Sequence, residues 1–321
     1  MITIEDFGPV PPGARGAFLA VGNFDGVHRG HAHLIGRLRA LADAAGAPAI
    51  ALTFDPSPAA VLRPEAEPAR LTWIERRIEL LRQAGATDVG VFRTGRWLLG
   101  LTAREFFDRS VIGQFGARGM VEGPTFGFGR DRGGDAHVLG DWCAGAGLAF
   151  EIASPTDLGG TIVSSGRIRK ALAAGDVADA AEMLGRPHRL RGRVVKGEGR
   201  GRQLGFPTAN LGGIDVLIPD DGVYAARARV DGEGPWMASA VHIGPNATFG
   251  AVDRTVEAFL IDRDIDLYGR PIELDLIDRL RGSRKFDGVG ALIEQMHRDV
   301  DRARRVAEAG AAGLDAAARP G

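Results

Sequence analysis

The chain has 321 residues, 45% of them hydrophobic and 25% charged, proportions that are ordinary for globular proteins and exclude a wholly disordered or fibrous chain. Because this length exceeds what one hydrophobic core usually organises, we expect two domains. Lys and Arg number 40 against 41 Asp and Glu, and the net charge of -1 provides no broad field for polyanions, which disfavours a nucleic-acid partner. Any bound phosphate must therefore be held locally, by backbone amides, helix N-termini and a few placed cations.

The cysteine content and the apolar runs bear on the cellular compartment. Cys143 is the sole cysteine, so neither an intrachain disulfide nor a cysteine-rich metal site can form, which fits a reducing compartment. The first residues lack the basic and apolar pattern of a signal peptide, and no run approaches the ~18 apolar residues that span a bilayer. We therefore expect a cytoplasmic protein without membrane attachment.

Short apolar runs alternate with amphipathic stretches through the first half, which is the pattern of successive βα units around a parallel sheet. The predicted strands are 17–21, 49–54, 88–92, 119–122 and 148–152. Helices are expected between them. Two of these helices carry a predicted capping box, Thr72 with Glu75 and Thr102 with Glu105. Gly85 predicts the end of the first.

The pattern becomes β-rich in the second half, which favours a small barrel. The predicted strands are 189–195, 223–230, 237–243, 255–261 and 272–276. An amphipathic helix over 288–307 follows, and the Ala/Gly-rich end is expected to fray. The predicted domains are 1–184 and 185–308, with a frayed tail at 309–321.

The first chemical signal lies between the first predicted strand and a predicted helix, where residues 22–31 read Gly-Asn-Phe-Asp-Gly-Val-His-Arg-Gly-His. Glycine lets the backbone approach a phosphate closely, and a helix start offers amides and the positive end of its dipole. His28 and His31 are placed to bind phosphoryl oxygens. This context favours a nucleotide site over a tight turn with two solvated histidines. A zinc site is disfavoured because the pair has no thiolate partner and no obvious third ligand.

Two further segments combine small residues with arginine. Residues 163–169 read Val-Ser-Ser-Gly-Arg-Ile-Arg, in which Ser164 and Ser165 are suited to cap a helix, and capping alone is the simpler interpretation. Residues 196–205 read Lys-Gly-Glu-Gly-Arg-Gly-Arg-Gln-Leu-Gly, which suggests a phosphate-covering loop that is neither a Walker A sequence nor a Rossmann fingerprint. A flexible surface loop is the alternative.

Residues 22–31 resemble the HxGH nucleotidyltransferases, and together with 163–169 they resemble the adenylyltransferase domain of the bacterial bifunctional riboflavin kinase/FMN adenylyltransferase (FAD synthetase) family. The resemblance implies an α/β domain with a parallel sheet. In it, His28 and His31 stabilise the charge that develops at the α-phosphate of ATP, and Arg169 neutralises the leaving pyrophosphate. The implied nucleotide-binding residues are Gly22, Asn23, Phe24, Gly30, Ser164 and Ser165. The implied flavin-binding residues are Phe54, Asp55, Thr125, Phe126 and Phe128.

Residues 196–210 end in Pro-Thr-Ala-Asn and resemble the signature of riboflavin kinases, which are small six-stranded β-barrels followed here by a predicted C-terminal helix. The resemblance implies that Thr208 and Asn210 hold the Mg²⁺ that bridges the ATP phosphates. It also implies that Glu257 orients the riboflavin 5′-hydroxyl and accepts its proton; an outward-facing strand glutamate is the alternative. The residues implied to cover the phosphates are Gly197, Gly199, Arg202 and Gly205.

Several positions depart from the family pattern. Ser57 stands where the family usually has His, Thr125 where it has Asn or Asp, and Gly166 where it has Thr. In the second half, His242 replaces an Asn and Ala247 replaces a Pro. These departures leave open a riboflavin kinase whose N-terminal domain has lost transfer activity. A non-catalytic flavin- or nucleotide-binding regulator is a further alternative, disfavoured because binding alone does not require the full set of catalytic side chains.

The resemblance spans nearly the whole chain and predicts a bifunctional enzyme of flavin cofactor synthesis. One site would convert riboflavin and ATP to FMN and ADP, and the other would convert FMN and ATP to FAD and pyrophosphate. The expected cofactor is Mg²⁺. The expected partners are the small molecules ATP, riboflavin and FMN, with no nucleic acid, and we expect a monomer or a weak homo-oligomer.

Overall fold

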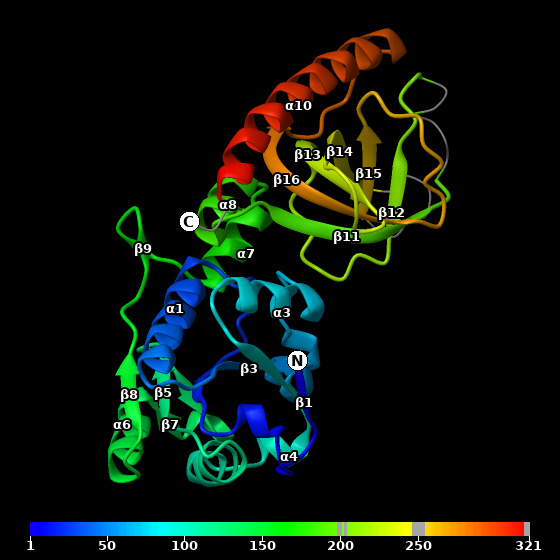
Figure 1. Cartoon of the computed structure of the whole chain (residues 1–321). Helices are drawn as coiled ribbons and strands as arrows, with labels where there is room; N and C mark the ends of the chain where they lie inside the picture. The colour runs from blue at the N-terminus through cyan, green and yellow to red at the C-terminus, as the bar shows by residue number, and fades with distance from the viewer. Residues whose placement is uncertain (198–200, 202–203, 246–253, 318–321) are drawn as a thin grey trace. The chain divides into compact units, whose positions relative to one another are not determined.

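The structure is a computed structural model that describes residues 1–197, 201, 204–245 and 254–317. The chain folds into two compact units, Met1–Ser164 and Ser165–Gly321, each with its own core (Figure 1). The predicted boundary at 184/185 stays a prediction, because it concerns functional domains rather than packing. Among the described residues, no helix is both long and apolar enough to cross a membrane.

The first unit is built on a six-stranded sheet in the order β1-β4-β3-β2-β5-β8, and every neighbouring pair is parallel. Its strands are β1 (Ile2–Ile4), β2 (Phe18–Val21), β3 (Ala49–Asp55), β4 (Asp88–Arg93), β5 (Gly119–Glu122) and β8 (Ala149–Ile152). All five predicted strands are confirmed to within one residue at each end. Only β1 was not predicted, because three residues are too few to show a period.

The chain runs from β2 to β3 to β4 on one side of the sheet, and then crosses to β5 and β8 on the other. The strand order therefore reverses between β2 and β5. In open α/β sheets, ligands bind beyond the carboxyl ends of the strands at such a reversal. The turn at residues 22–31 leaves β2 at this position.

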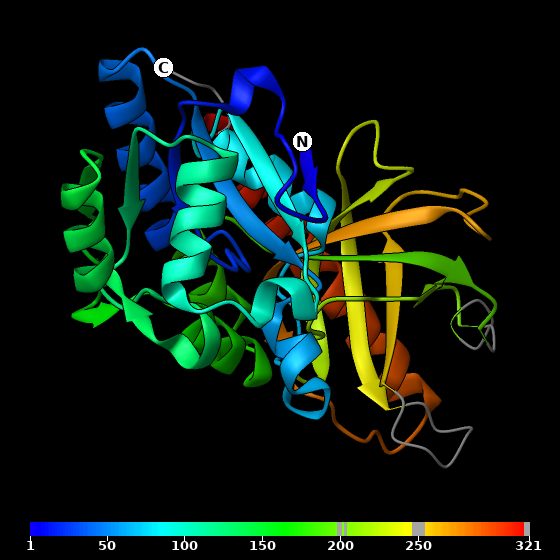
Figure 2. The same ribbon diagram turned by 90° about the horizontal axis from the view of Figure 1, so that it is seen from below.

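Helices cover both faces of the sheet (Figures 1 and 2). On β2, Phe18 and Ala20 belong to the core beneath α1 and α3, whereas Leu19 and Val21 belong to the opposite core. The strand is buried on both faces and reads as a continuous apolar run, as parallel strands do. The helices of this unit are α1 (Arg29–Ala44), α2 (Pro58–Leu62), α3 (Ile74–Gln83), α4 (Arg96–Leu99), α5 (Ala103–Phe106), η3 (Phe107–Gln114) and α6 (Ala136–Gly145).

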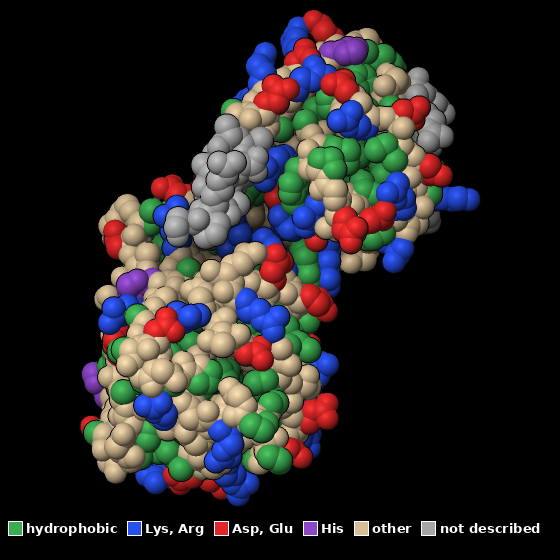
Figure 3. Space-filling view, viewed as in Figure 1, with side chains coloured by type: hydrophobic (Ala, Val, Ile, Leu, Met, Phe, Trp, Pro, Cys, Tyr) green, Lys and Arg blue, Asp and Glu red, His purple; other side chains and the backbone are tan. Residues whose placement is uncertain are grey.

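Short elements fill the connections of the first unit. Three are single 3-10 turns, η1 (Pro12–Ala14), η2 (Pro64–Ala66) and η4 (Arg130–Arg132). Four are two-residue strands that form the antiparallel pairs β6 (Gly127–Phe128) with β7 (Gly134–Asp135) and β9 (Asp157–Leu158) with β10 (Thr161–Ile162). Basic and acidic side chains are interspersed over the visible face of this unit (Figure 3).

One of the two predicted capping boxes is confirmed. The Thr102 hydroxyl accepts the Glu105 N–H at 3.2 Å, and the Glu105 carboxylate accepts the Thr102 N–H at 2.9 Å. The box predicted at Thr72 is wrong, because the Thr72 hydroxyl bonds Asp25 and Gly26 instead, and α3 begins at Ile74. Gly85 does follow the end of that helix, with a φ of +116° that favours glycine.

The second unit contains a closed antiparallel barrel in the order β11-β12-β15-β14-β13-β16 (Figure 2). Its strands are β11 (His188–Val195), β12 (Ala209–Gly212), β13 (Gly222–Val230), β14 (Met237–Pro245), β15 (Arg254–Leu260) and β16 (Pro271–Arg281). Sequence patterning located every strand of the barrel except β12, whose first two residues, Ala209 and Asn210, end the Pro-Thr-Ala-Asn motif. It also ended β16 at residue 276, whereas the charged segment that follows continues to pair with β13 to Arg281.

In the described part of the second unit, the barrel is accompanied by α7 (Ser165–Ala173), α8 (Val177–Leu184) and α10 (Val289–Ala317). Helix α10 packs on β13, β14 and β16 through a buried stripe that includes Ala303. The sequence predicts this helix to end at residue 307, but it continues to Ala317. The added segment is rich in alanine, the residue with the highest helix propensity.

Candidate active sites

The turn at residues 22–31 is fixed to the neighbouring strand β3. Gly22 N–H donates to the Leu52 carbonyl at 3.0 Å, and the Thr53 hydroxyl donates to the Asn23 carbonyl at 3.0 Å. Within the turn, Phe24 and Val27 have φ values of 47° and 38°. Such angles cost non-glycine residues on the order of 1–3 kcal/mol each and persist where the surroundings enforce them, often at functional sites.

Asp25 is the anchor that enforces this conformation, and the sequence analysis did not single it out. Its buried carboxylate accepts the Leu71 N–H at 3.0 Å and the Thr72 N–H at 3.1 Å. The Thr72 hydroxyl donates to the same carboxylate at 3.2 Å and accepts the Gly26 N–H at 3.1 Å. Arg77 lies 3.6 Å away and supplies a positive charge. An aspartate between two turn glycines was the available signal.

The two predicted catalytic histidines lie together at the start of α1. His28 occupies the N-cap position, where its Nδ1 accepts the His31 N–H at 3.3 Å. The two rings stack with centroids 3.7 Å apart and planes at 17°. Because Nδ1 of His28 accepts, a neutral ring carries its proton on Nε2, which is then a donor. A Cβ on Gly30 would lie 3.2 Å from the His28 ring, so glycine at this position avoids a close contact with that ring.

The structure places the predicted flavin-binding residues at the same carboxyl edge of the sheet. Phe54 and Asp55 end β3, and Phe54 stacks on Phe92 with centroids 5.6 Å apart. Thr125 lies exposed in the loop after β5, where its carbonyl accepts from Arg132 at 3.2 Å. Two more of the set follow Thr125, Phe126 in the loop and Phe128 on β6, and their rings stack with centroids 5.2 Å apart.

Ser57 occupies the position at which the family usually has His, and its hydroxyl has a local structural role. It caps α2 by accepting the Ala60 N–H at 3.1 Å, and it donates to Glu67 at 3.1 Å. A hydroxyl engaged in a cap is not thereby a nucleotide ligand.

The remaining predicted residues of the adenylyltransferase site lie in the stretch of chain where the first unit ends and the second begins. Ser164 ends the first unit, while Ser165 and Arg169 lie on α7 in the second. Helix α7 begins at Ser165, as the serine pair predicts. The role of Arg169 toward pyrophosphate stays a prediction.

In the barrel, the structure brings together Thr208, Asn210 and Glu257. The Thr208 hydroxyl donates to the Glu257 carboxylate at 3.1 Å. Asn210 on β12 lies directly opposite Glu257 on β15. Directly opposite residues share a face of an antiparallel sheet, so the three polar side chains converge.

Two glycines of the 196–205 segment lie close against neighbouring residues of this site. A Cβ on Gly197 would lie 2.1 Å from the Asn210 amide nitrogen, and one on Gly201 would lie 2.4 Å from the Phe206 carbonyl. Only glycine permits such approach. Gly205 has a φ of +86°. The predicted residues Gly199 and Arg202 lie outside the described residues.

A pocket of about 320 Å³ adjoins Thr208 and Glu257. Its walls are mainly apolar and come from the barrel, the segment after β16 and α10, and they include Phe206, Phe259 and Phe286. An apolar pocket with a few convergent polar groups at one end is suited to a planar ring system that carries a reactive hydroxyl.

His242 is a pocket residue that sequence reasoning noted only as a departure. It lies on β14 directly opposite Glu257 and lines the same pocket. Desolvation lowers the pKa of His242, while the nearby Glu257 carboxylate opposes that shift. At neutral pH it is therefore a neutral hydrogen-bonding group beside the proposed base.

Within the part of the chain that the structure describes, no group of three or more His, Cys, Asp and Glu side chains is placed to hold a metal ion. The donor set at the barrel is of a different kind, a hydroxyl and an amide beside one carboxylate. Hard oxygen donors of this type suit Mg²⁺, which keeps several waters and takes few protein ligands.

An HxGH turn at the reversal of a parallel sheet, and a closed barrel with a Thr-Asn-Glu cluster, together define a two-domain transferase. A family model described as FAD synthetase matches residues 11–167, and one described as riboflavin kinase matches residues 184–307. The chain belongs to the bifunctional riboflavin kinase/FMN adenylyltransferase family.

Named relatives show the extent of the similarity. The bifunctional riboflavin kinase/FMN adenylyltransferase of Pseudomonas fluorescens is 36% identical over 297 residues, which cover 92% of this chain and 94% of that protein. The Escherichia coli K12 relative of the same name is 34% identical over 287 residues, which cover 89% of this chain and 91% of that protein. A solved structure described as a macrolide-efflux protein from Streptococcus pneumoniae has a TM-score of 0.84 at 29% identity, covering 94% of this chain and 98% of that one.

Proposed function

We propose that the barrel phosphorylates riboflavin at the Thr208–Glu257 site and that the His28–His31 turn joins FMN to the AMP moiety of ATP. The family supplies the two reactions, and the residue roles are our proposal. The observation that supports them best is the hydrogen bond between Thr208 and Glu257 at the polar end of an apolar pocket.

In the kinase reaction, Glu257 would accept the proton of the riboflavin 5′-hydroxyl as that oxygen forms a bond to the γ-phosphorus of ATP. The bond from the γ-phosphorus to the β,γ-bridging oxygen breaks, and ADP leaves. The apolar walls hold the ring system and exclude water. Thr208 and Asn210 would hold Mg²⁺, which when bound neutralises charge on the phosphates. Gly197 and Gly201 allow the loop to lie against these two side chains.

In the adenylyl transfer, a phosphate oxygen of FMN would attack the α-phosphorus of ATP, and the bond to the α,β-bridging oxygen would break to release pyrophosphate. Nε2–H of His28 and the His31 ring would donate to the crowded α-phosphate at the amino end of α1, where the helix dipole also favours negative charge. Arg169 would bind the pyrophosphate as it leaves. Ser164 and Ser165 would bind the nucleotide beside it.

The second candidate function is a riboflavin kinase whose adenylyltransferase is inactive. The observation that favours it is the Ser57 hydroxyl, which is occupied by the cap of α2 and by Glu67. Intact anchoring of the His28–His31 turn by Asp25 favours the bifunctional enzyme. We further propose that the enzyme works in the cytoplasm as a monomer or weak homo-oligomer on ATP, riboflavin and FMN.

A time course separates the two candidates. The full chain is incubated with riboflavin, ATP and Mg²⁺, and the flavins are resolved by chromatography. Sequential FMN and FAD support both activities. FMN that accumulates without FAD, even when FMN is supplied in excess, supports the kinase alone. Absence of FMN would contradict the kinase assignment.

A further inference from the structure

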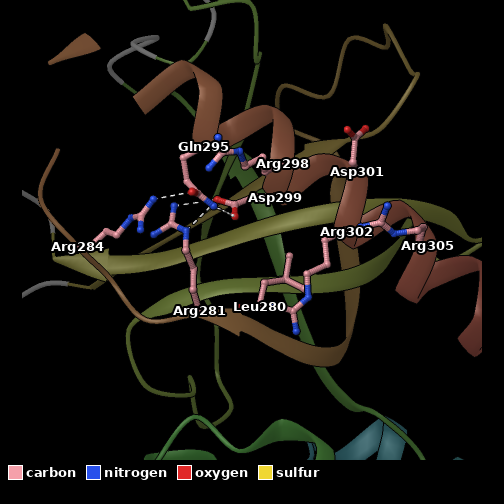
Figure 4. A pocket seen from close by; sticks show the side chains of 9 residues that line it. All are labelled: Leu280, Arg281, Arg284, Gln295, Arg298, Asp299, Asp301, Arg302 and Arg305. Carbon is pink, nitrogen blue, oxygen red and sulfur yellow. Dashed lines mark hydrogen bonds and ion pairs between the residues drawn. The ribbon is translucent and has the colours of Figure 1, made fainter. Parts of the chain in front are cut away.

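A hollow of about 560 Å³ lies beside α10, next to the kinase pocket described above. Its walls come from α10, the end of β16 and the segment that follows β16 (Figure 4). Five arginines line it against two aspartates, so the lining is strongly positive in a chain whose net charge is -1. The arginines are Arg281, Arg284, Arg298, Arg302 and Arg305.

The acidic groups of the hollow are already engaged. Both oxygens of the buried Asp299 are used, one by Arg281 at 2.8 Å and the other by the Gln295 amide at 2.7 Å. Arg284 donates to the Gln295 carbonyl oxygen, which extends this network (Figure 4). Asp301 lies 3.5 Å from Arg304, a residue outside the hollow. Asp299 therefore does not neutralise the arginines along α10, and Asp301 is shared between them and Arg304.

Three of the arginines follow one side of α10 at spacings of four and three residues, at Arg298, Arg302 and Arg305. Arg298 has an exposed ion pair with Glu294, a kind that contributes little. Arg302 donates to the Leu280 carbonyl at 2.9 Å and lies 3.5 Å from Asp278. Among the side chains that the structure describes, Arg305 has no acidic partner within ion-pair distance.

A solvated helix face is the simplest interpretation of such a row, but it does not explain why the helix carries charges that repel each other. Like charges three and four residues apart on a helix repel each other and destabilise it. The helix dipole does not compensate, because its effect is confined to the last turn, and α10 continues to Ala317. The row also lines a concave site rather than a flat face. A bound anion would remove the repulsion.

We propose that this arginine hollow binds a polyphosphate chain, as found in a nucleoside di- or triphosphate or in free inorganic polyphosphate. Guanidinium groups match phosphate oxygens with paired, charge-assisted hydrogen bonds. The row from Arg298 to Arg305 rises about 10 Å along the helix, which suits several linked phosphates better than one.

The hollow shares part of its wall with the kinase pocket, through Arg281, Arg284 and Asp299. A polyphosphate that draws Arg281 or Arg284 toward itself competes with Asp299 and Gln295 for these guanidinium groups. Occupancy should therefore change the KM for riboflavin. This consequence depends on the kinase assignment, whereas the binding itself does not.

Calorimetric titration of the full chain with inorganic tripolyphosphate tests the proposal. Arg298→Gln with Arg305→Gln removes two charges whose side chains make no buried contact, and it should weaken one class of binding at least about tenfold. The matched control is Arg39→Gln with Arg263→Gln, which removes two exposed charges outside the hollow. The control should bind as the wild type does.

Unchanged binding in the first variant would overturn the proposal, as would equal weakening in both, which would indicate a general charge effect. Parallel titrations with ATP and AMP identify the source. Tripolyphosphate equal to ATP assigns the site to the phosphate chain alone, tighter ATP assigns it to a nucleotide, and AMP should bind weakly in either case. As a second readout, tripolyphosphate should shift the riboflavin KM at saturating ATP in the wild type and in the control, and not in the hollow variant.

Discussion

At the scale of single residues, Glu257 is the group whose chemistry can be changed with least change of shape. Glu257→Gln keeps an oxygen that can accept from Thr208 and removes the carboxylate that takes the proton. We expect FMN formation to fall by ~10² or more, with the KM for riboflavin and the melting temperature nearly unchanged. Steady-state rates of FMN formation measure this, and the matched control is Glu273→Gln, at a carboxylate outside the pocket. Near-normal turnover would remove Glu257 from the role of base.

His28 and His31 give a second test at the same scale. A double change to Ala removes both donors at the proposed α-phosphate site, and the loss of one preorganised donor typically costs ~10²–10³ in turnover. We expect the variant to make FMN from riboflavin and to lose synthesis of FAD from supplied FMN. The retained kinase activity is the folding control.

His33 offers a matched comparison, because it follows on the same helix outside the turn. His33→Ala should leave FAD synthesis close to the wild-type rate. If the His28/His31 variant makes FAD as fast as the wild type, the turn does not carry the reaction.

At the scale of elements, β2 and β5 pair only at Phe18–Gly119 and Leu19–Met120. Beyond the end of this ladder, the Glu122 side chain forms the next hydrogen bond between the two strands. Its carboxyl oxygen accepts the Val21 N–H at 2.7 Å, one residue before the turn at residues 22–31. Burial raises the pKa of Glu122 well above its usual value near 4.5, against the smaller opposite effect of that hydrogen bond.

A raised pKa in the folded state means that the native protein holds a proton that the unfolded chain releases. The stabilisation is therefore fully present below about pH 4.5 and is lost as the pH rises toward the folded pKa, by up to about 1.4 kcal/mol per pH unit. Glu122→Gln should remove this dependence, so its free energy of unfolding relative to the wild type should increase between pH 5 and 8.

Urea unfolding followed by tryptophan fluorescence measures this difference, because three of the four tryptophans lie in the first unit. Glu151→Gln is the control: the hydrogen bond to Arg37 lowers the pKa of Glu151, so its contribution is complete above about pH 4.5 and its difference from the wild type should stay constant between pH 5 and 8. Wild-type and Glu122→Gln curves that stay parallel across this pH range would contradict a protonated Glu122.

The elements also show where sequence reasoning succeeds and where it stops. The buried strands of the sheet were predictable because both of their faces are apolar. The barrel strands were predictable because the sequence changes from alternating apolar runs and amphipathic stretches to closely spaced β-rich segments. Strand β12 was not predicted, because its segment was interpreted as part of a metal-binding motif rather than as an alternating apolar and polar run. The structural roles of Asp25 and Glu122 were not predicted, because their hydrogen-bond partners, Thr72 and Val21, are distant in sequence. The Thr72 capping box failed for the same reason: a long-range bond displaced a local one.

At the scale of the whole molecule, the His28–His31 turn and the Thr208–Glu257 cluster lie in different units, each with its own core. The motifs at 22–31 and 196–210 predicted this division, because each of the two lies within one pattern of strands. What they could not provide is the convergence inside a unit, such as the approach of Thr208 and Asn210 to Glu257 across two strands.

The division predicts that kinase activity can be abolished without loss of FAD synthesis. Thr208→Ala with Asn210→Ala deletes the two oxygen donors proposed for Mg²⁺, and we expect kinase turnover to fall by ~10² or more at any Mg²⁺ concentration. The His28–His31 turn lies in the other unit, so FAD synthesis from supplied FMN should stay within about twofold of the wild-type rate. Rates of both reactions across a magnesium titration measure this. Thr255→Ala, which removes a hydroxyl elsewhere on β15, should leave both rates intact. Loss of both activities in a variant with a native melting temperature would contradict separate sites, and a normal kinase rate would show that Thr208 and Asn210 do not hold the metal.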